Sequence, residues 1–189
     1  MTPLDAGRTA LLLMDFQPDI LAARAGSAEV LASAQAALEL ARKADVQVVF
    51  VRVAFTPQDY ASASARNKSF GAIGTSGRLR ADAPGSAVHP DLAPAERDVV
   101  VTKTRVGAFS TTNLHTHLTG RGIDTLILGG VSTSGVVLST IRDAADRDYR
   151  LLVLRDCCLD DPEVHDVLMN KVFPRQADVI DVPELANLL

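Results

Sequence analysis

Short apolar runs alternate with stretches of helical periodicity along most of the chain. Residues 10–14 form a continuous apolar run, which is typical of a parallel strand buried on both faces. The same pattern predicts further strands at residues 48–53, 98–102, 125–129, 151–154 and, more weakly marked, 178–181. Between them, apolar residues at helical spacing predict helices at residues 28–43, 111–121, 134–147 and 162–172. This alternation predicts an α/β fold with a mostly parallel sheet and helices on both of its faces.

One long stretch, residues 56–97, departs from this pattern. It holds four glycines and four prolines and shows little periodicity. A loop of this length inside a compact domain is usually a lid, a binding loop or an arm for oligomer contacts, and the sequence leaves these three open. Because no repeat, low-complexity tract or linker divides the chain, we expect a single domain over residues 1–189.

The composition narrows the classes of partner. Apolar residues make up 47% of the chain and charged residues 22%, as is ordinary for a soluble globular protein. A net charge of -4 without a basic stripe argues against nucleic acid as a partner. The longest apolar runs are far too short to span a bilayer, and the amino terminus lacks the features of a signal peptide. These features predict a cytoplasmic protein with no membrane partner.

Polar residues of types that carry out catalysis or bind ligands follow the predicted strands. Asp15 ends the first strand, Lys103 follows the third, and residues 130–136 lead from the fourth strand into a helix. In parallel sheets, ligands bind outside these carboxyl ends. A carboxylate in a cleft there has a raised pKa and can transfer a proton. A lysine beside it can hold it ionised, or stabilise an oxyanion or a substrate carboxylate. The structural alternatives are a turn cap for Asp15 and a solvated cation for Lys103.

Two further features belong to the same edge. Arg105 suits a substrate carboxylate, or else a surface ion pair. The glycine-containing turn offers backbone N–H groups to an anion or oxyanion, although Thr133 and Ser134 are equally good helix caps. A hydroxyl nucleophile needs a base, and we expect the four histidines to lie on the surface away from this edge, so a serine triad has little support.

The two cysteines, Cys157 and Cys158, are adjacent. Neighbouring cysteines pair only through a strained ring, so two free thiols are expected in a reducing compartment. A redox sensor built on them stays open and would need a thiol of depressed pKa.

Three stretches taken together resemble the isochorismatase-like, or cysteine hydrolase, superfamily. They are residues 12–17 (LLMDFQ), residues 103–109 (KTRVGAF) and residues 130–136 (GVSTSGV), the last followed by residues 143–145 (DAA). Each is weak alone, but they occur in the family's order and spacing over most of the chain. The resemblance implies a three-layer Rossmann-like fold with a six-stranded, mostly parallel sheet, assembled as a homodimer or homotetramer. It also implies a cis peptide between Val131 and Ser132.

The resemblance also assigns catalytic positions. Members that cleave amides use an Asp, Lys and Cys triad, which falls here on Asp15, Lys103 and Val136. Valine offers no nucleophile, and Cys157 and Cys158 lie elsewhere in the pattern. The Asp-x-His metal pattern of nicotinamidases is also missing after the second strand, where residues 54–57 read AFTP. No metal and no cofactor is therefore expected.

The family contains a precedent for losing the cysteine. True isochorismatases are similar in having a small residue there, and they protonate a vinyl ether with the Asp while water completes the cleavage. This chain differs at Val136, at Gly107 and at residues 132–134, so isochorismate itself is not assigned. The interpretation is a hydrolase of a small, carboxylate-bearing molecule in which Asp15 is the general acid/base and Lys103 orients it. The expected substrate-binding residues are Gln17, Arg105, Phe109, Ser132, Thr133, Ser134 and Gly135.

The rival hypothesis is a catalytically silent small-molecule-binding protein or oligomeric scaffold of the same fold. It predicts no hydrolysis of amides or vinyl ethers. A buried Asp–Lys pair argues against it, because desolvating two charges rarely stabilises a protein.

Overall fold

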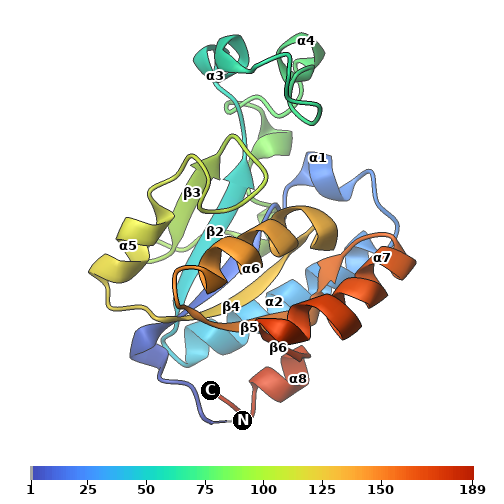
Figure 1. Cartoon of the computed structure of the whole chain (residues 1–189). Coiled ribbons are helices and arrows are strands. Elements are labelled where there is room, and N and C mark those ends of the chain that lie inside the picture. Colours follow the sequence, from blue (N-terminus) through green and yellow to red (C-terminus); the bar gives the residue numbers. More distant parts are fainter. Residues whose placement is uncertain (1) are drawn as a thin grey trace.

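The computed structural model describes residues 2–189 and has a six-stranded sheet at its centre (Figure 1). All pairings are parallel, and the strands follow the order β3-β2-β1-β4-β5-β6. The strands are β1 (Thr9–Met14), β2 (Gln47–Val53), β3 (Val99–Lys103), β4 (Thr125–Val131), β5 (Arg150–Leu159) and β6 (Asp178–Ile180). The predicted α/β fold with a six-stranded parallel sheet is therefore confirmed.

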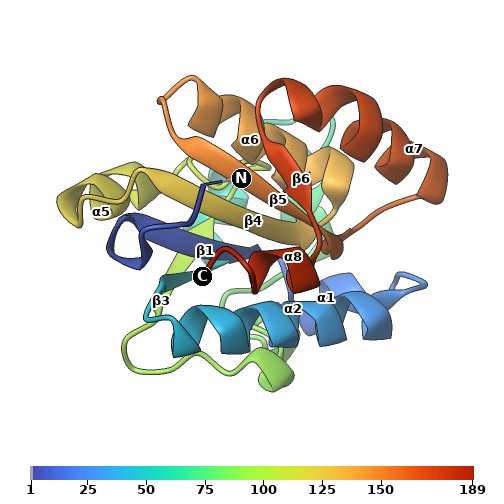
Figure 2. The same cartoon turned by 90° about the horizontal axis from the view of Figure 1, so that it is seen from below.

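Helices cover both faces of the sheet, which gives three layers (Figure 2). One face carries α1 (Pro18–Leu21), α2 (Ser27–Lys43) and α8 (Val182–Leu185). The other face carries α5 (Leu114–Gly120), α6 (Leu138–Ala145) and α7 (Pro162–Val167). Within residues 2–189, no helix is both long enough and apolar enough to cross a membrane.

The central strand β1 shows how the sequence builds two cores. All six of its residues are buried, and successive side chains point to opposite faces of the sheet. Leu12 and Met14 pack in the core under α5 and α6, whereas Leu11 and Leu13 pack in the core under α2. Burial on both faces explains why this strand is an unbroken apolar run.

Several element boundaries differ from the prediction. The helix expected from residue 111 begins at Leu114, because Thr111 has a left-handed backbone with φ of 62°. The helices expected at 134–147 and 162–172 each contain a single π-helical turn, at Thr133–Val137 and Leu168–Val172. A π turn widens the helix locally and leaves no mark in an apolar pattern.

Residues 56–97 form an irregular segment, as predicted, but they contain short helical turns. These are α3 (Pro57–Ser62), α4 (Ile73–Ser76) and 3-10 turns at Pro84–Ser86 and Pro90–Leu92. The helices α3 and α4 stand beyond the carboxyl end of β2 (Figure 1). The segment is tied to the body of the fold by a bridge between Phe55 and Arg80. Its position places it over the edge where ligands bind in such sheets.

Candidate active site

Asp15 lies where β1 leaves the sheet. Its backbone is left-handed, with φ of 60°, a conformation that aspartate tolerates better than most residues. The turn is fixed at both ends, because the Asp15 N–H donates to the Val51 carbonyl at 2.7 Å and the Asp15 carbonyl accepts from the Gln17 N–H at 2.9 Å. The residue is only 5% exposed. The end of β1 therefore holds a carboxylate inside the protein rather than at its surface.

Lys103 reaches the same point from the other side of β2. It ends β3 opposite Val53, and it is 2% exposed. Its Nζ donates to Asp15 Oδ2 at 2.9 Å and to the Arg105 carbonyl at 3.1 Å. The two residues are 88 positions apart in sequence and form a buried ion pair.

Two opposing effects set the protonation of this carboxyl group. Burial raises the pKa of Asp15, whereas the charge and hydrogen bond of Lys103 and, as the smallest contribution, the Val53 backbone lower it, with a net pKa of about 6. Oδ2 is occupied by Lys103, whereas Oδ1 is buried without a hydrogen-bond partner among the described residues. Asp15 therefore has one free oxygen and a pKa close to neutrality, which are the properties of a general acid or base.

The turn after β4 forms the opposite wall. The peptide between Val131 and Ser132 is cis, as the resemblance implied. The Gly135 N–H donates to Ser132 Oγ at 3.2 Å, and the Ser134 N–H and Oγ both donate to Asp160 Oδ2, at 2.7 and 2.6 Å. Of the two alternatives for this turn, an anion site or a structural cap, these occupied donors support the structural one.

A cavity of about 260 Å³ joins these parts at the carboxyl edge of the sheet. Ligand sites usually start at about 300 Å³, so this cavity suits a small molecule. Its lining is Asp15, Asp19, Ile20, Ala23, Arg24, Val53, Phe70, Arg78, Leu79, Lys103, Val106, Val131, Ser132, Gly135 and Val136. The acid–lysine pair and Val136 are buried in this lining, and charged side chains from α1, the loop after it and the 56–97 segment are exposed.

Five of the predicted substrate-binding residues do not line this cavity. The Gln17 side chain donates to the carbonyls of Val53 and Ser86, both at 2.9 Å, and accepts from the Val53 N–H at 2.8 Å. This amide ties the end of β2 to the 56–97 segment, so its role is structural. It is fully buried, because three backbone groups satisfy it.

The other four are also engaged elsewhere. The Arg105 guanidinium donates to the Thr104 carbonyl at 2.6 Å and lies over the Phe70 ring, 5.7 Å from its centroid. Phe70, not Arg105, lines the cavity. Phe109 stacks on Tyr149, with centroids 6.0 Å apart. Thr133 and Ser134 are held by side chains that follow β5.

The Thr133 contact corrects the expectation that the histidines lie away from this edge. Thr133 Oγ1 is 2.9 Å from His165 Nδ1, on α7. Burial lowers the pKa of His165, and the nearby positive charge of Arg155 lowers it further. Neither Thr133 nor His165 lines the cavity, so this contact supports the turn and does not complete a serine-type triad.

Several lining residues, most notably Arg24 and Arg78, are not predicted from the sequence. Arg24 lies between α1 and α2, and Arg78 lies in the 56–97 segment, just before the bridge at Arg80. Neither belongs to a periodic pattern or a motif. The single available signal was their position in loops next to the predicted edge.

The thiols are separate from this site. Cys157 and Cys158 lie inside β5, are buried and do not line the cavity. Burial raises the pKa of Cys158 to about 12, which is opposite to what a reactive thiol requires. Across residues 2–189, no three His, Cys, Asp or Glu side chains are grouped so that they could hold a metal ion.

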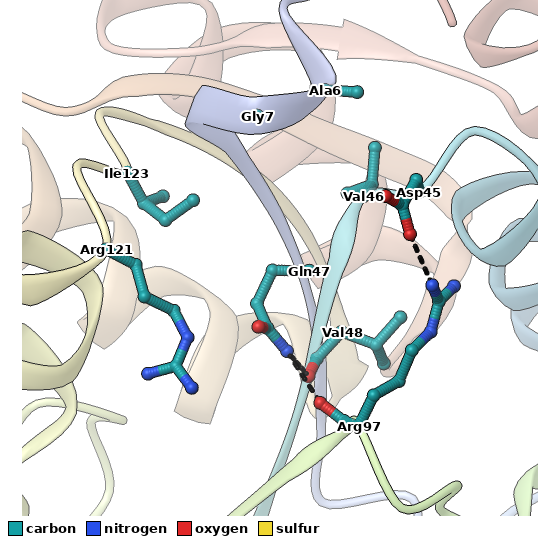
Figure 3. Close-up of a pocket in the computed structure, with 9 residues that line it drawn as sticks. All are labelled: Ala6, Gly7, Asp45, Val46, Gln47, Val48, Arg97, Arg121 and Ile123. Carbon is teal, nitrogen blue, oxygen red and sulfur yellow. Dashed lines mark hydrogen bonds and ion pairs between the residues drawn. The ribbon is translucent and has the colours of Figure 1, made fainter.

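A second cavity, of about 300 Å³, lies at the opposite edge of the sheet (Figure 3). It is bordered by the segment before β1, the start of β2 and the loop before β4. Of the two arginines that line it, Arg97 is paired with Asp45. This is the amino edge of the strands, where ligands do not bind in open parallel sheets. The cavity beside Asp15 is therefore the candidate active site.

A buried acid–lysine pair in a small cavity at the carboxyl edge of a six-stranded parallel sheet defines an α/β protein of the hydrolase type. The isochorismatase domain model matches residues 9–184, and the chain belongs to this family. It is 33% identical to the uncharacterized isochorismatase family protein YecD of Escherichia coli O157:H7, over the whole of both chains. It is 27% identical to the maleamate amidohydrolase of Pseudomonas putida, covering 92% of this chain and 83% of that one. A cysteine hydrolase structure from Pseudomonas syringae pv. phaseolicola has a TM-score of 0.85 and 25% identity, covering 99% of this chain and 94% of the other.

Proposed function

We propose that the protein hydrolyses a small, carboxylate-bearing molecule by proton transfer from Asp15, without a cysteine nucleophile. The observation that carries this proposal is the state of the Asp15 carboxyl group. One oxygen is fixed by Lys103 at 2.9 Å, the other has no partner among residues 2–189, and the pKa is about 6. At neutral pH roughly a tenth of such groups carry a proton, which is enough to supply a general acid.

The chemistry follows from these groups. On a vinyl ether, Asp15 gives its proton to the substrate carbon that faces Oδ1, and water adds to the carbon that becomes electron-poor while returning a proton to the Asp15 carboxylate. The hemiacetal or hemiketal formed in this way then breaks its C–O bond, which releases an alcohol and leaves a carbonyl product. Lys103 fixes the orientation of the carboxyl group and compensates its charge after the proton has left. A vinyl ether fits this sequence best, because protonation of its carbon needs no enzyme-bound intermediate. Val53, Phe70 and Val106 form an apolar part of the cavity wall.

The residue at position 136 argues against an acyl-enzyme intermediate. Val136 lines the cavity near the turn and carries no nucleophilic atom, and the cavity lining contains no cysteine. We therefore propose that Val136 stands where the cysteine of the amide-cleaving relatives stands. Resistance of turnover to iodoacetamide is the expected consequence.

The test is turnover of a panel of small carboxylate-bearing vinyl ethers and amides, with maleamate as the amide probe. We expect vinyl-ether cleavage whose kcat/KM falls as the pH rises through about 6, since the donor is then deprotonated. Asp15→Asn keeps the shape but not the acid, and should lower kcat by about 10²–10⁴-fold. The matched control is Asp45→Asn, which changes an exposed aspartate with nearly the same backbone (φ 61°) at the other edge of the sheet.

Turnover that survives Asp15→Asn would remove the proposed acid. Inhibition by iodoacetamide would show that a thiol takes part after all. If no member of the panel is cleaved although small acids bind the cavity, the catalytically silent binding protein becomes the better description.

A further inference from the structure

We propose that Arg24 and Arg78 form the anchor for the substrate carboxylate at the mouth of the cavity beside Asp15. This inference rests on the proposed function for the identity of the pocket, and it assigns the anionic end of the substrate to residues other than Lys103 and Arg105. The ligand class is a small monocarboxylic or dicarboxylic acid whose reacting end lies at Asp15.

The two residues first expected to hold a carboxylate are committed elsewhere. Lys103 Nζ already donates to Asp15 and to the Arg105 carbonyl. The Arg105 guanidinium donates to the Thr104 carbonyl and stacks on Phe70, and it does not line the cavity. Lys103 keeps one N–H donor but lies at the buried end, beside Asp15, so a carboxylate at the mouth of the cavity would be held by another cation.

Arg24 and Arg78 supply it. Both line the cavity and both are exposed. No salt bridge or side-chain hydrogen bond joins either guanidinium to any residue within 2–189. A guanidinium that keeps its donors free at the edge of a cavity is suited to a planar carboxylate, which it can bind through two parallel hydrogen bonds.

The charge of the lining points the same way. Three cationic side chains (Arg24, Arg78, Lys103) and two acidic ones (Asp15, Asp19) line the cavity, in a chain whose net charge is -4. Asp160, outside the lining, interacts electrostatically with Arg24, which leaves Arg78 as the cation of the mouth without an acidic side chain within residues 2–189 that an ion pair or hydrogen bond joins to it. A cation at the mouth favours an anion over a neutral or cationic ligand of the same shape.

The arrangement also orients the substrate. Asp15 and Lys103 are buried, whereas the two arginines lie at the exposed rim, on different segments of the chain. A carboxylate held between them would direct the rest of the molecule along the apolar wall of Val53 and Phe70 towards Asp15. Arg78 belongs to the 56–97 segment, so an anion that contacts both arginines also links this segment to the loop after α1.

The experiment compares benzoate with benzamide, which share shape and differ in charge, by calorimetric titration of the full chain. We expect the wild type to bind benzoate about tenfold more tightly than benzamide, with a preference that shrinks as salt is added. Arg24→Gln and Arg78→Gln should each weaken benzoate binding several-fold, and the double variant should bind both probes equally. The expected change in affinity is modest because ion pairs between exposed groups contribute little free energy in water.

Arg66→Gln is the matched control, because Arg66 is an exposed arginine of the same segment that does not line the cavity. It should bind both probes as the wild type does. The anchor is overturned if the double variant keeps the preference for benzoate, if Arg66→Gln loses it to the same extent, or if the wild type binds neither probe saturably. If the double variant loses the preference for benzoate and the wild type hydrolyses no substrate of the panel, the anchor stands and the proposed hydrolase does not. If the double variant keeps the preference and the wild-type turnover depends on Asp15, the hydrolase stands and the anchor does not.

Discussion

Replacing Asp15 with asparagine should change how the stability of the protein depends on pH. The pKa of this buried carboxyl is about 6 in the folded protein, against 3.8 for the unperturbed group. Between these values the folded state holds a proton that the unfolded state has lost. The wild type is therefore stabilised on the acid side, and this contribution is lost as the pH rises through about 6. Asparagine does not titrate, so the variant lacks the effect.

The size of the effect follows from the same two values. The full difference corresponds to about 3 kcal/mol, of which about 2–3 kcal/mol falls between pH 4 and pH 7.5. The Asp15 side chain is only 7% exposed, so solvent screening removes little of it. As the pH rises from 4 to 7.5, the free energy of unfolding of the wild type should therefore fall by about 2–3 kcal/mol relative to that of Asp15→Asn.

The assay is urea unfolding of both proteins at half-unit pH intervals, and the quantity of interest is the difference between their unfolding free energies. Asp160→Asn provides a control of opposite sign. Burial of Asp160 is outweighed by its hydrogen bonds with Ser134, so its pKa is lowered below 3.8. The wild type should therefore gain stability over this variant as the pH rises towards about 4 and show a nearly level difference above about 5, so the series includes points below pH 4. A flat difference for Asp15→Asn, or one that rises with pH, would refute the raised pKa and with it the proposed acid.

Two further outcomes are expected. Gln17→Met removes three hydrogen bonds, two of them to the buried N–H and carbonyl of Val53, whereas the Ser86 carbonyl keeps its bond from Arg52. The free energy of unfolding should therefore fall by about 2–5 kcal/mol, measured as a shift of the urea midpoint at unchanged slope. A change below 0.5 kcal/mol, on the order expected for a surface site, would contradict the structural role. Cys157 and Cys158 should not react with a thiol reagent at pH 8 until the protein unfolds, because burial raises the pKa of both thiols. Fast labelling of the native protein would reopen the redox-sensor alternative.

The sheet and the acid–lysine pair were predictable from sequence because both depend on strands with apolar sequences. The central strand β1 is buried on both faces, and the edge strand β3 begins with three valines although Val100 is exposed. The chemistry of a parallel sheet gathers at the carboxyl ends of such strands. The position of Asp15 directly after residues 10–14, and of Lys103 at the end of residues 98–102, was therefore enough to bring them to one edge. The register of β2 and β3 places Lys103 beside Val53, and from there its Nζ reaches Asp15 Oδ2 at 2.9 Å.

The rest of the site escaped prediction for a physical reason. Arg24 and Arg78 lie in segments without periodicity, and the path of such a segment depends on contacts that no local pattern encodes. Gln17 and Thr133 differ from the two arginines because each lies in a recognisable motif. A motif does not show whether a polar side chain faces a ligand or bonds to the protein itself, since that depends on partners elsewhere in the chain. For Gln17 these partners are backbone groups of β2 and residue 86, and for Thr133 the partner is His165.

The properties of Asp15 depend on the pair rather than on either residue alone. Burial without a cation would favour the neutral carboxyl so strongly that the group could donate a proton but not lose it readily. Lys103 without burial would keep the carboxylate ionised, with nothing to donate. Because the two effects oppose each other at one atom pair, the pKa falls at about 6, where both forms are populated near neutral pH. A buried ion pair rarely adds stability, and this one leaves Oδ1 without a partner in the cavity. Its arrangement is costly for folding and suited to proton transfer, which is the strongest physical argument for an enzyme over a silent scaffold.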